Sequence, residues 1–232
     1  MSILSENYNR WHNNAKSASA LKHESVFNDR VLNMLKAKRG QTILDVGCGT
    51  GSFCLAAFKN GLEITGLDFS SVALKKARSL NQKLKLILSD VHSLPFEDGF
   101  FDHAVCLGSL EHFSDKKKAL REISRILKPS GKAFILLPNS YFIGHIYLVM
   151  KTGMPPDEGG QQFNEDFNTK IGWKDILEKE HFKVISIKKF NTIAASQKVS
   201  PITRYIYNLA VKHFIPSNLS YAFGYLCVKK RI

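Results

Sequence analysis

Glycines and acidic residues are spaced for ligand binding in one short stretch of the chain. Asp45 lies in an apolar run and is followed by glycines at 47, 49 and 51, and Asp68 ends the next apolar run. Glycines permit φ > 0 and carry no Cβ, so a ligand could lie directly against backbone N–H groups. A carboxylate at the end of the next strand is where nucleoside-binding folds hold ribose hydroxyls. The chemistry indicated is recognition of a nucleoside cofactor.

The apolar periodicity predicts the elements that position these groups. Residues 42–46 form an expected buried strand and residues 52–58 a helix, so the glycines lie in a strand-to-helix turn. Further strands are expected over 62–67, 84–88, 101–107, 133–137, 182–187 and 221–228, and helices over 23–35, 70–80, 115–127, 170–180 and 202–214. We expect the helix over 115–127 to stop at Pro129 and Gly131. This alternation predicts an α/β fold with a parallel core, and right-handed crossovers gather the loops after the first three strands at one edge.

The stretch from Asp45 to Gly51, Asp-Val-Gly-Cys-Gly-Thr-Gly, resembles motif I of the class I S-adenosylmethionine-dependent methyltransferases. The resemblance covers roughly residues 23–139 and continues in order through 67–71, 88–91, 94–102, 110–112 and 126–132. These motifs complete the pattern of the small-molecule, methyltransferase type 11-like branch, and the resemblance is specific for cofactor and fold but not for substrate. It implies a Rossmann-like fold: a mostly parallel seven-stranded sheet with an antiparallel last strand and helices on both faces.

The resemblance implies S-adenosylmethionine as the cofactor. The residues that would bind it are those of the glycine turn and of the following strand ends: Asp45, Gly47, Cys48, Gly49, Gly51, Asp68, Phe69, Asp90, Val91 and Leu107. Asp45 would hold the ammonium group, Asp68 both ribose hydroxyls, and Asp90 with Val91 the adenine. Asp68 stands where glutamate is commoner. Alternatives without a ligand are a strand-end turn acid for Asp68 and a helix N-cap for Asp90.

Methyl transfer from a sulfonium needs alignment and desolvation more than acid or base chemistry. A hydroxyl acceptor must nevertheless lose a proton, so O-methylation, which we favour, calls for a base near the methyl group. The candidate is His112, which follows the fourth strand, and His145 could act from the opposite side. A purely structural role for His112 is the alternative. The sequence predicts no metal site.

We expect one domain over residues 1–232. Residues 1–38 would form an N-terminal lid and helix, 39–139 the cofactor-binding core, 140–170 a substrate-lid insertion and 171–232 the substrate-side half. Tyr8 and Trp11 would either cover the cofactor or pack the first helix on the sheet. The four cysteines show no pairing pattern, and no window is apolar enough to span a bilayer. These features predict a cytoplasmic protein with reduced thiols.

The net charge of +13 is concentrated late in the chain, where no Asp or Glu follows Glu180. Three explanations compete: a solvated basic face, contact with an anionic membrane or lipid-borne substrate, and nucleic-acid binding. The apolar run from Tyr141 to Met150 favours the membrane, although a homodimer would bury the same side chains. The acceptor is therefore expected to be a small molecule or linked to lipid or glycan. Alternatives are an RNA-modifying methyltransferase, a catalytically silent cofactor-binding protein and an NAD-dependent oxidoreductase.

Overall fold

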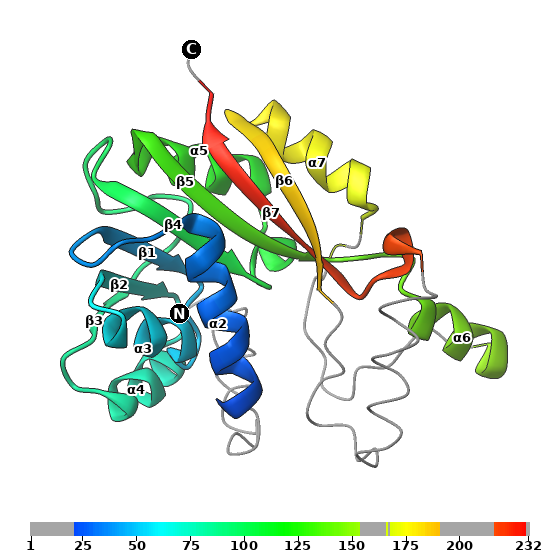
Figure 1. The fold of residues 1–232 in the computed structure, drawn as a ribbon, viewed down its shortest axis with the longest axis horizontal. Coiled ribbons are helices and arrows are strands. Elements are labelled where there is room, and N and C mark those ends of the chain that lie inside the picture. Colours follow the sequence, from blue (N-terminus) through cyan, green and yellow to red (C-terminus); the bar gives the residue numbers. More distant parts are fainter. Residues whose placement is uncertain (1–20, 154–165, 167, 191–215, 231–232) are drawn as a thin grey trace.

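Seven strands form a single sheet in the order β3-β2-β1-β4-β5-β7-β6 in the computed structural model, which describes residues 21–153, 166, 168–190 and 216–230 (Figure 1). All neighbours pair in parallel except β7, which is antiparallel to both β5 and β6. This confirms the predicted mostly parallel sheet with an antiparallel last strand. The strands are β1 (Thr42–Val46), β2 (Glu63–Asp68), β3 (Lys85–Leu88), β4 (Phe101–Leu107), β5 (Leu127–Pro138), β6 (Phe182–Phe190) and β7 (Ala222–Lys229).

Helices cover both faces of the sheet, as predicted. One core packs α2, α3 and α4 on one face, and a second packs η1, α5 and α7 on the other. Alternate residues of a strand serve the two cores, for example Ile43 and Leu44 of β1, because successive side chains point to opposite faces. The helical elements are α2 (Leu21–Leu35), α3 (Ser52–Lys59), α4 (Ser71–Leu80), η1 (Leu110–His112), α5 (Lys116–Ile126), α6 (Ile143–Thr152), α7 (Lys170–Lys179) and η2 (Ser217–Leu219).

The boundary between α5 and β5 differs from the prediction. The helix ends at Ile126, and β5 begins at Leu127, so Pro129 and Gly131 lie inside the strand. The pairing of β4 with β5 shifts register between Phe101 and His103, which accommodates a proline that cannot donate to the ladder. The sequence showed the breakers but not that the chain turns directly from helix into strand.

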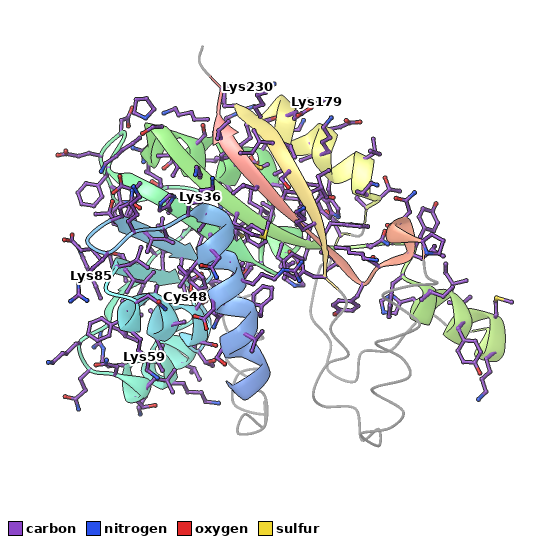
Figure 2. The ribbon with its side chains drawn as sticks, in the orientation of Figure 1. Lys36, Cys48, Lys59, Lys85, Lys179 and Lys230 are labelled. Atoms are coloured by element: carbon purple, nitrogen blue, oxygen red, sulfur yellow. The ribbon has the colours of Figure 1, made fainter. Side chains whose placement is uncertain are left out.

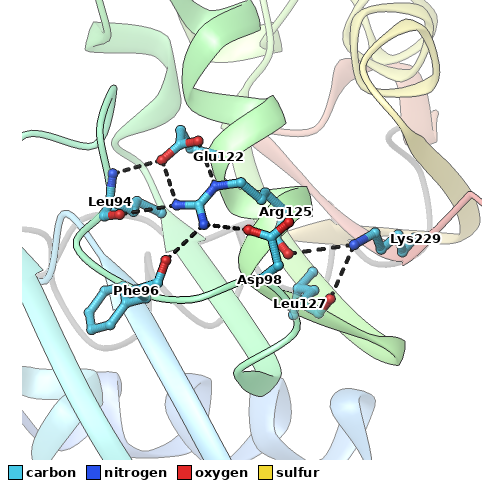
Figure 3. Close-up of polar contacts among 7 residues, drawn as sticks. All are labelled: Leu94, Phe96, Asp98, Glu122, Arg125, Leu127 and Lys229. Carbon is cyan, nitrogen blue, oxygen red and sulfur yellow. Dashed lines mark hydrogen bonds and ion pairs between the residues drawn. The ribbon is translucent and has the colours of Figure 1, made fainter.

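Arg125 at the end of α5 fixes the loop that precedes β4 (Figure 3). Its guanidinium donates to the carbonyl oxygens of Leu94 and Phe96 at 3.0 and 2.7 Å and pairs with Asp98 at 2.7 Å and Glu122 at 2.8 Å. Glu122 in turn accepts from the N–H of Leu94. The loop is therefore held by charge-assisted bonds at the edge of the sheet where β4 begins.

Three predicted features lie outside the described residues: Tyr8 and Trp11, the helix over 202–214, and most of the loop after α6. Within the predicted insertion, α6 extends from the body of the fold (Figure 1). The division into lid, core and substrate half stays a prediction. The described lysines Lys36, Lys59, Lys85, Lys179 and Lys230 lie exposed around the molecule, which spreads positive charge over several elements (Figure 2).

Candidate cofactor site

The strand order reverses between β1 and β4, and this seam is the expected ligand site of an open α/β sheet. The glycine turn leaves β1 there and leads into α3, while β2 ends beside it at Asp68. Gly47, Gly49 and Gly51 have φ of 71°, 51° and 81°. A Cβ on Gly47 would lie 2.5 Å from Ser109 Oγ, so the turn and the loop after β4 approach more closely than a side chain permits.

The N–H groups of this turn are already engaged within the protein. Gly47 and Cys48 donate to the carbonyl oxygen of Leu67 at 2.8 and 2.9 Å, Gly51 donates to Cys48, and Gly49 donates to Asp68. A ligand at the turn would meet these four N–H groups with partners already in place, and its contact with the backbone at the start of α3 stays a prediction. The glycines provide positive φ angles, which residues with a side chain rarely adopt, and a surface without Cβ atoms.

Asp68 is a buried carboxylate that joins the turn to the end of β2. Its Oδ2 accepts from the N–H of Gly49 and its Oδ1 from the N–H of Ser70, both at 2.8 Å. Ser70 then caps α4 by accepting from Ala73 at 3.1 Å. Asp68 thus has the structural role of a turn acid, and its proposed contact with ribose would be made by the same carboxylate.

Asp45 is more deeply buried than Asp68, and its carboxylate lies beside the thiol of Cys54. Cys54 Sγ lies 3.3 Å from its Oδ2, and the thiols of Cys54 and Cys48 are hydrogen-bonded to each other. Burial raises the pKa of Asp45 to about 7; the hydrogen bond from Cys54 opposes this rise, and the charge of Asp68 adds to it. All four cysteines are free and buried, as predicted.

The residues expected to contact the adenine differ in exposure. Asp90 is largely exposed and precedes no helix, so the helix N-cap alternative is wrong; its carboxylate accepts instead from His92. The side chain of Val91 is buried in the core beneath α5, which leaves its backbone for a ligand. Phe69 is partly exposed at the end of β2, and Leu107 packs against the core on the α2 side.

The two candidate bases lie on different elements. His112 is the last residue of η1, beyond the carboxyl end of β4, and its N–H donates to the carbonyl oxygen of Ser109. His145 lies in α6 among the rings of Phe142 and Tyr221, with centroids 5.1 and 6.3 Å away. His112 thus follows β4 and His145 follows β5, and both catalytic roles stay predictions.

Sequence reasoning missed three contributors to the site: Cys54, His92 and Ser109. Ser109 Oγ donates to the carbonyl oxygen of Gly47 at 3.2 Å and so joins the turn to the loop after β4. Only the spacing of His92 two residues after Asp90 could have pointed to it. Within the described ranges no cluster of His, Cys, Asp and Glu could hold a metal ion, and no helix has the length and apolarity needed to cross a bilayer.

The residues present fit S-adenosylmethionine: two buried acids flank a turn in which alternate residues are glycines. Known proteins agree with this assignment. A methyltransferase domain family matches residues 44–135. The demethylmenaquinone methyltransferase of Staphylococcus haemolyticus is 31% identical over 81% of this chain and 85% of its own length. That of Staphylococcus aureus strain MRSA252 is 33% identical over 57% of this chain, which spans only 56% of that relative.

Among solved structures, a SAM-dependent methyltransferase from Archaeoglobus fulgidus superposes with a TM-score of 0.62 at 20% identity, over 90% of this chain and 94% of its own. That likeness concerns the fold, which is the Rossmann-like methyltransferase fold predicted from the sequence. The family follows from the sequence match over most of both chains in the S. haemolyticus relative. This chain belongs to the class I S-adenosylmethionine-dependent methyltransferases of the small-molecule type.

Proposed function

We propose that this chain transfers the methyl group of S-adenosylmethionine to a small-molecule or lipid-linked acceptor. The observation that carries the proposal is the pair of buried carboxylates, Asp45 and Asp68, beside the glycine turn. Buried acids are unfavourable unless they are paired, and the cofactor brings an ammonium and a sulfonium to the same place. The ammonium group would give the buried carboxylate of Asp45 a charged partner, and the ribose hydroxyls would add donors to Asp68, which already accepts from Gly49 and Ser70.

In this proposal the chain aligns the reactants and excludes water. S-adenosylmethionine supplies an activated methyl group on its sulfonium. Asp45 holds the ammonium end, Asp68 the ribose hydroxyls, and Asp90 with the backbone of Val91 the adenine. Positioning of this kind can supply roughly 7–11 kcal/mol of the barrier reduction without any acid or base. The alternative of a catalytically silent binding protein would keep cofactor binding and lose transfer to every acceptor.

The first candidate for the acceptor atom is a hydroxyl oxygen. Its proton would pass to His112, which lies half-buried beyond the end of β4, or to His145 on α6. His112→Asn and His145→Asn should each be assayed for the rate of methyl transfer at several pH values. Loss of the acidic limb of the pH–rate profile in one variant would identify the base. Unchanged profiles in both would show that neither residue is the base.

The second candidate is a ring atom of a quinone. It is favoured by the relatives, which are named for demethylmenaquinone. Incubation of the protein with trideuteromethyl-labelled cofactor and reduced demethylmenaquinone, or a simple phenol, followed by mass spectrometry and NMR, would identify the methylated atom. Label recovered instead in tRNA or rRNA would overturn the small-molecule proposal in favour of RNA modification.

A lipid-borne acceptor would bring the protein to an anionic membrane as a peripheral partner. In α6 the side chains of Tyr147, Val149 and Met150 are 63%, 44% and 81% exposed, and Lys151 follows them. Exposed apolar side chains beside basic ones are typical of interfacial helices. The net charge of +13 adds electrostatic attraction, at about 1 kcal/mol for each basic residue near the surface.

Flotation with vesicles tests this contact. Anionic vesicles should retain the protein at low salt and release it at high salt, and Tyr147→Ser with Met150→Ser should weaken retention. Ile185→Ser is the matched control, because Ile185 is an exposed apolar residue on the edge strand β6. If the double variant changes the oligomeric state instead, measured by sedimentation, then α6 belongs to a homodimer interface. Failure of anionic vesicles to retain the wild type would overturn the membrane contact.

A further inference from the structure

His92 connects the loop after β3 to the start of α5. Its Nδ1 lies 2.6 Å from Asp90 Oδ1, and its Nε2 accepts from the backbone N–H of Asp115 at 3.2 Å. Asp115 is the N-cap of α5, where its carboxylate accepts from Lys118. The imidazole is mostly buried and packs edge-on against the ring of Phe113. One side chain therefore ties the predicted adenine loop to a helix of the core.

The contacts of the imidazole determine its tautomer. A backbone N–H can only donate, so Nε2 of His92 must present its lone pair to Asp115. A neutral imidazole with a lone pair on Nε2 carries its proton on Nδ1. That proton points at Asp90 Oδ1, which also accepts from the backbone N–H of His92 at 2.9 Å. Asp90 Oδ1 is thus held by two donors from a single residue.

The second oxygen of Asp90 has a different environment. In the parts of the chain that the structure describes, no hydrogen bond to Asp90 Oδ2 occurs, and the side chain is 70% exposed. The hydrogen bonds from His92 outweigh the opposing effect of burial and lower the pKa of the carboxyl, which keeps it an acceptor at neutral pH. A fixed carboxylate with one occupied and one open oxygen suits recognition of an exocyclic amino group.

We propose that His92 is a positioning residue for the nucleobase: it fixes Asp90 Oδ1 so that Oδ2 can accept from the amino group of adenine. The inference rests on the proposed cofactor site and extends it to a residue that would not touch the cofactor. Without the imidazole, only the backbone N–H of residue 92 would hold Asp90 Oδ1, and the exposed carboxylate would rotate more freely. The preference for an amino group over an oxo group on the base would then be lost.

Titration calorimetry with S-adenosylhomocysteine and S-inosylhomocysteine tests the inference, because the two ligands differ at the amino group. His92→Ala should weaken S-adenosylhomocysteine roughly tenfold, the effect of one charge-assisted hydrogen bond, and leave the inosine ligand nearly unchanged. His92→Asn places an amide donor near the position of Nδ1 and should restore binding to within about threefold of wild type. His92→Gln reaches toward Asp115 instead and should behave like His92→Ala.

Asp90→Ala is the second substitution of a double-mutant cycle with His92→Ala. If His92 acts through Asp90, adding His92→Ala to Asp90→Ala should weaken S-adenosylhomocysteine no further. Thermal unfolding of each variant reports any loss of the contact with Asp115.

Equal weakening of both ligands by His92→Ala, failure of His92→Asn to restore binding, or additive losses in the cycle would overturn the positioning role. If the wild type binds neither ligand, the proposed function fails and takes this inference with it. If the wild type binds S-adenosylhomocysteine and His92→Ala keeps the full preference for it, only this inference fails.

Discussion

Burial raises the pKa of Asp45 to about 7, and the charge of Asp68 adds to the rise while the hydrogen bond from Cys54 opposes it. Its carboxyl must be ionised to pair with an ammonium group, and its pKa is about 7. We therefore expect affinity for S-adenosylmethionine to rise about tenfold between pH 6 and pH 8 and then level off. Calorimetry across this range measures the rise. Asp45→Asn should bind weakly with a flat profile, and an equally steep profile in this variant would assign the titration to another group.

The same shift affects folding with a defined sign. The pKa of Asp45 is about 7 in the folded chain, against an ordinary 3.8. Below pH 3.8 the carboxyl is protonated in both the folded and the unfolded chain, and stability is highest. As the pH rises from 3.8 to 7 only the unfolded chain releases the proton, so stability falls. At pH 8 the penalty is about 4 kcal/mol. Asp45→Asn should therefore be more stable than wild type in urea at pH 8 and nearly equal at pH 4. No gain at pH 8 would contradict the burial argument.

At the residue scale, the sequence identified what is local and missed what depends on packing. Asp45 and Asp68 could be found because each ends or follows an apolar run beside glycines. Cys54 and Ser109 could not, because their contacts with Asp45 and Gly47 form only once the turn, α3 and the loop after β4 are folded together. The N–H groups of the turn looked available in sequence, yet β2 and Asp68 accept from them.

The glycine turn also sets how closely α3 and α4 pack. A Cβ on Gly51 would lie 2.7 Å from Ala77 Cβ, whereas one on Gly40 would meet nothing within 4 Å, and both residues have positive φ. Gly40→Ala should cost about 1 kcal/mol for its backbone conformation alone. Gly51→Ala should cost about 3 kcal/mol because the clash is added. Urea unfolding of both variants measures the difference, and equal losses would contradict the packing argument.

Asn139 links the end of β5 to the segments around η2. It is buried, and its Nδ2 donates to the carbonyl oxygens of Asn218 and Ser220 at 2.7 and 2.8 Å. Asn139→Ala would leave both carbonyls without this donor, so we expect a loss of about 3 kcal/mol in urea unfolding. Asn60→Ala is the control: Asn60 is exposed and donates to one helix carbonyl, so the loss should stay below about 0.5 kcal/mol.

Element positions were predictable wherever apolar periodicity was uninterrupted, as in β1, β4 and α4. Predicted boundaries were wrong where the local sequence signals disagree with the strand pairing of the folded chain. Pro129 and Gly131 are typical helix-stop residues, yet the pairing of Phe101 in β4 with Leu127 starts β5 at Leu127. Ser70 and Asp115 were correctly expected at helix starts. Each side-chain oxygen accepts from the backbone N–H three residues later, an interaction that depends on local sequence alone.

For the whole molecule, the sequence predicted the fold class because the resemblance implies a mostly parallel seven-stranded sheet with an antiparallel last strand. Periodicity alone gives strands and helices but not the insertion of β7 between β5 and β6. The separation of the core into two layers follows from that order, with Trp173 and Tyr225 buried on the α7 side and Phe53 and Leu35 on the α2 side. The acceptor cannot be deduced in this way, because it depends on side chains beyond the carboxyl ends of the strands.

The proposed cofactor site lies where the strand order reverses between β1 and β4, so a bound ligand should stabilise the whole sheet. S-adenosylhomocysteine at 100 times its Kd should raise the free energy of unfolding by about 2.7 kcal/mol and the Tm by roughly 5–10 °C. Asp68→Asn keeps the shape of the side chain and removes its charge, so the same ligand concentration should give a smaller shift. NAD is the control ligand. A larger shift with NAD than with S-adenosylhomocysteine would contradict the cofactor assignment and favour an oxidoreductase.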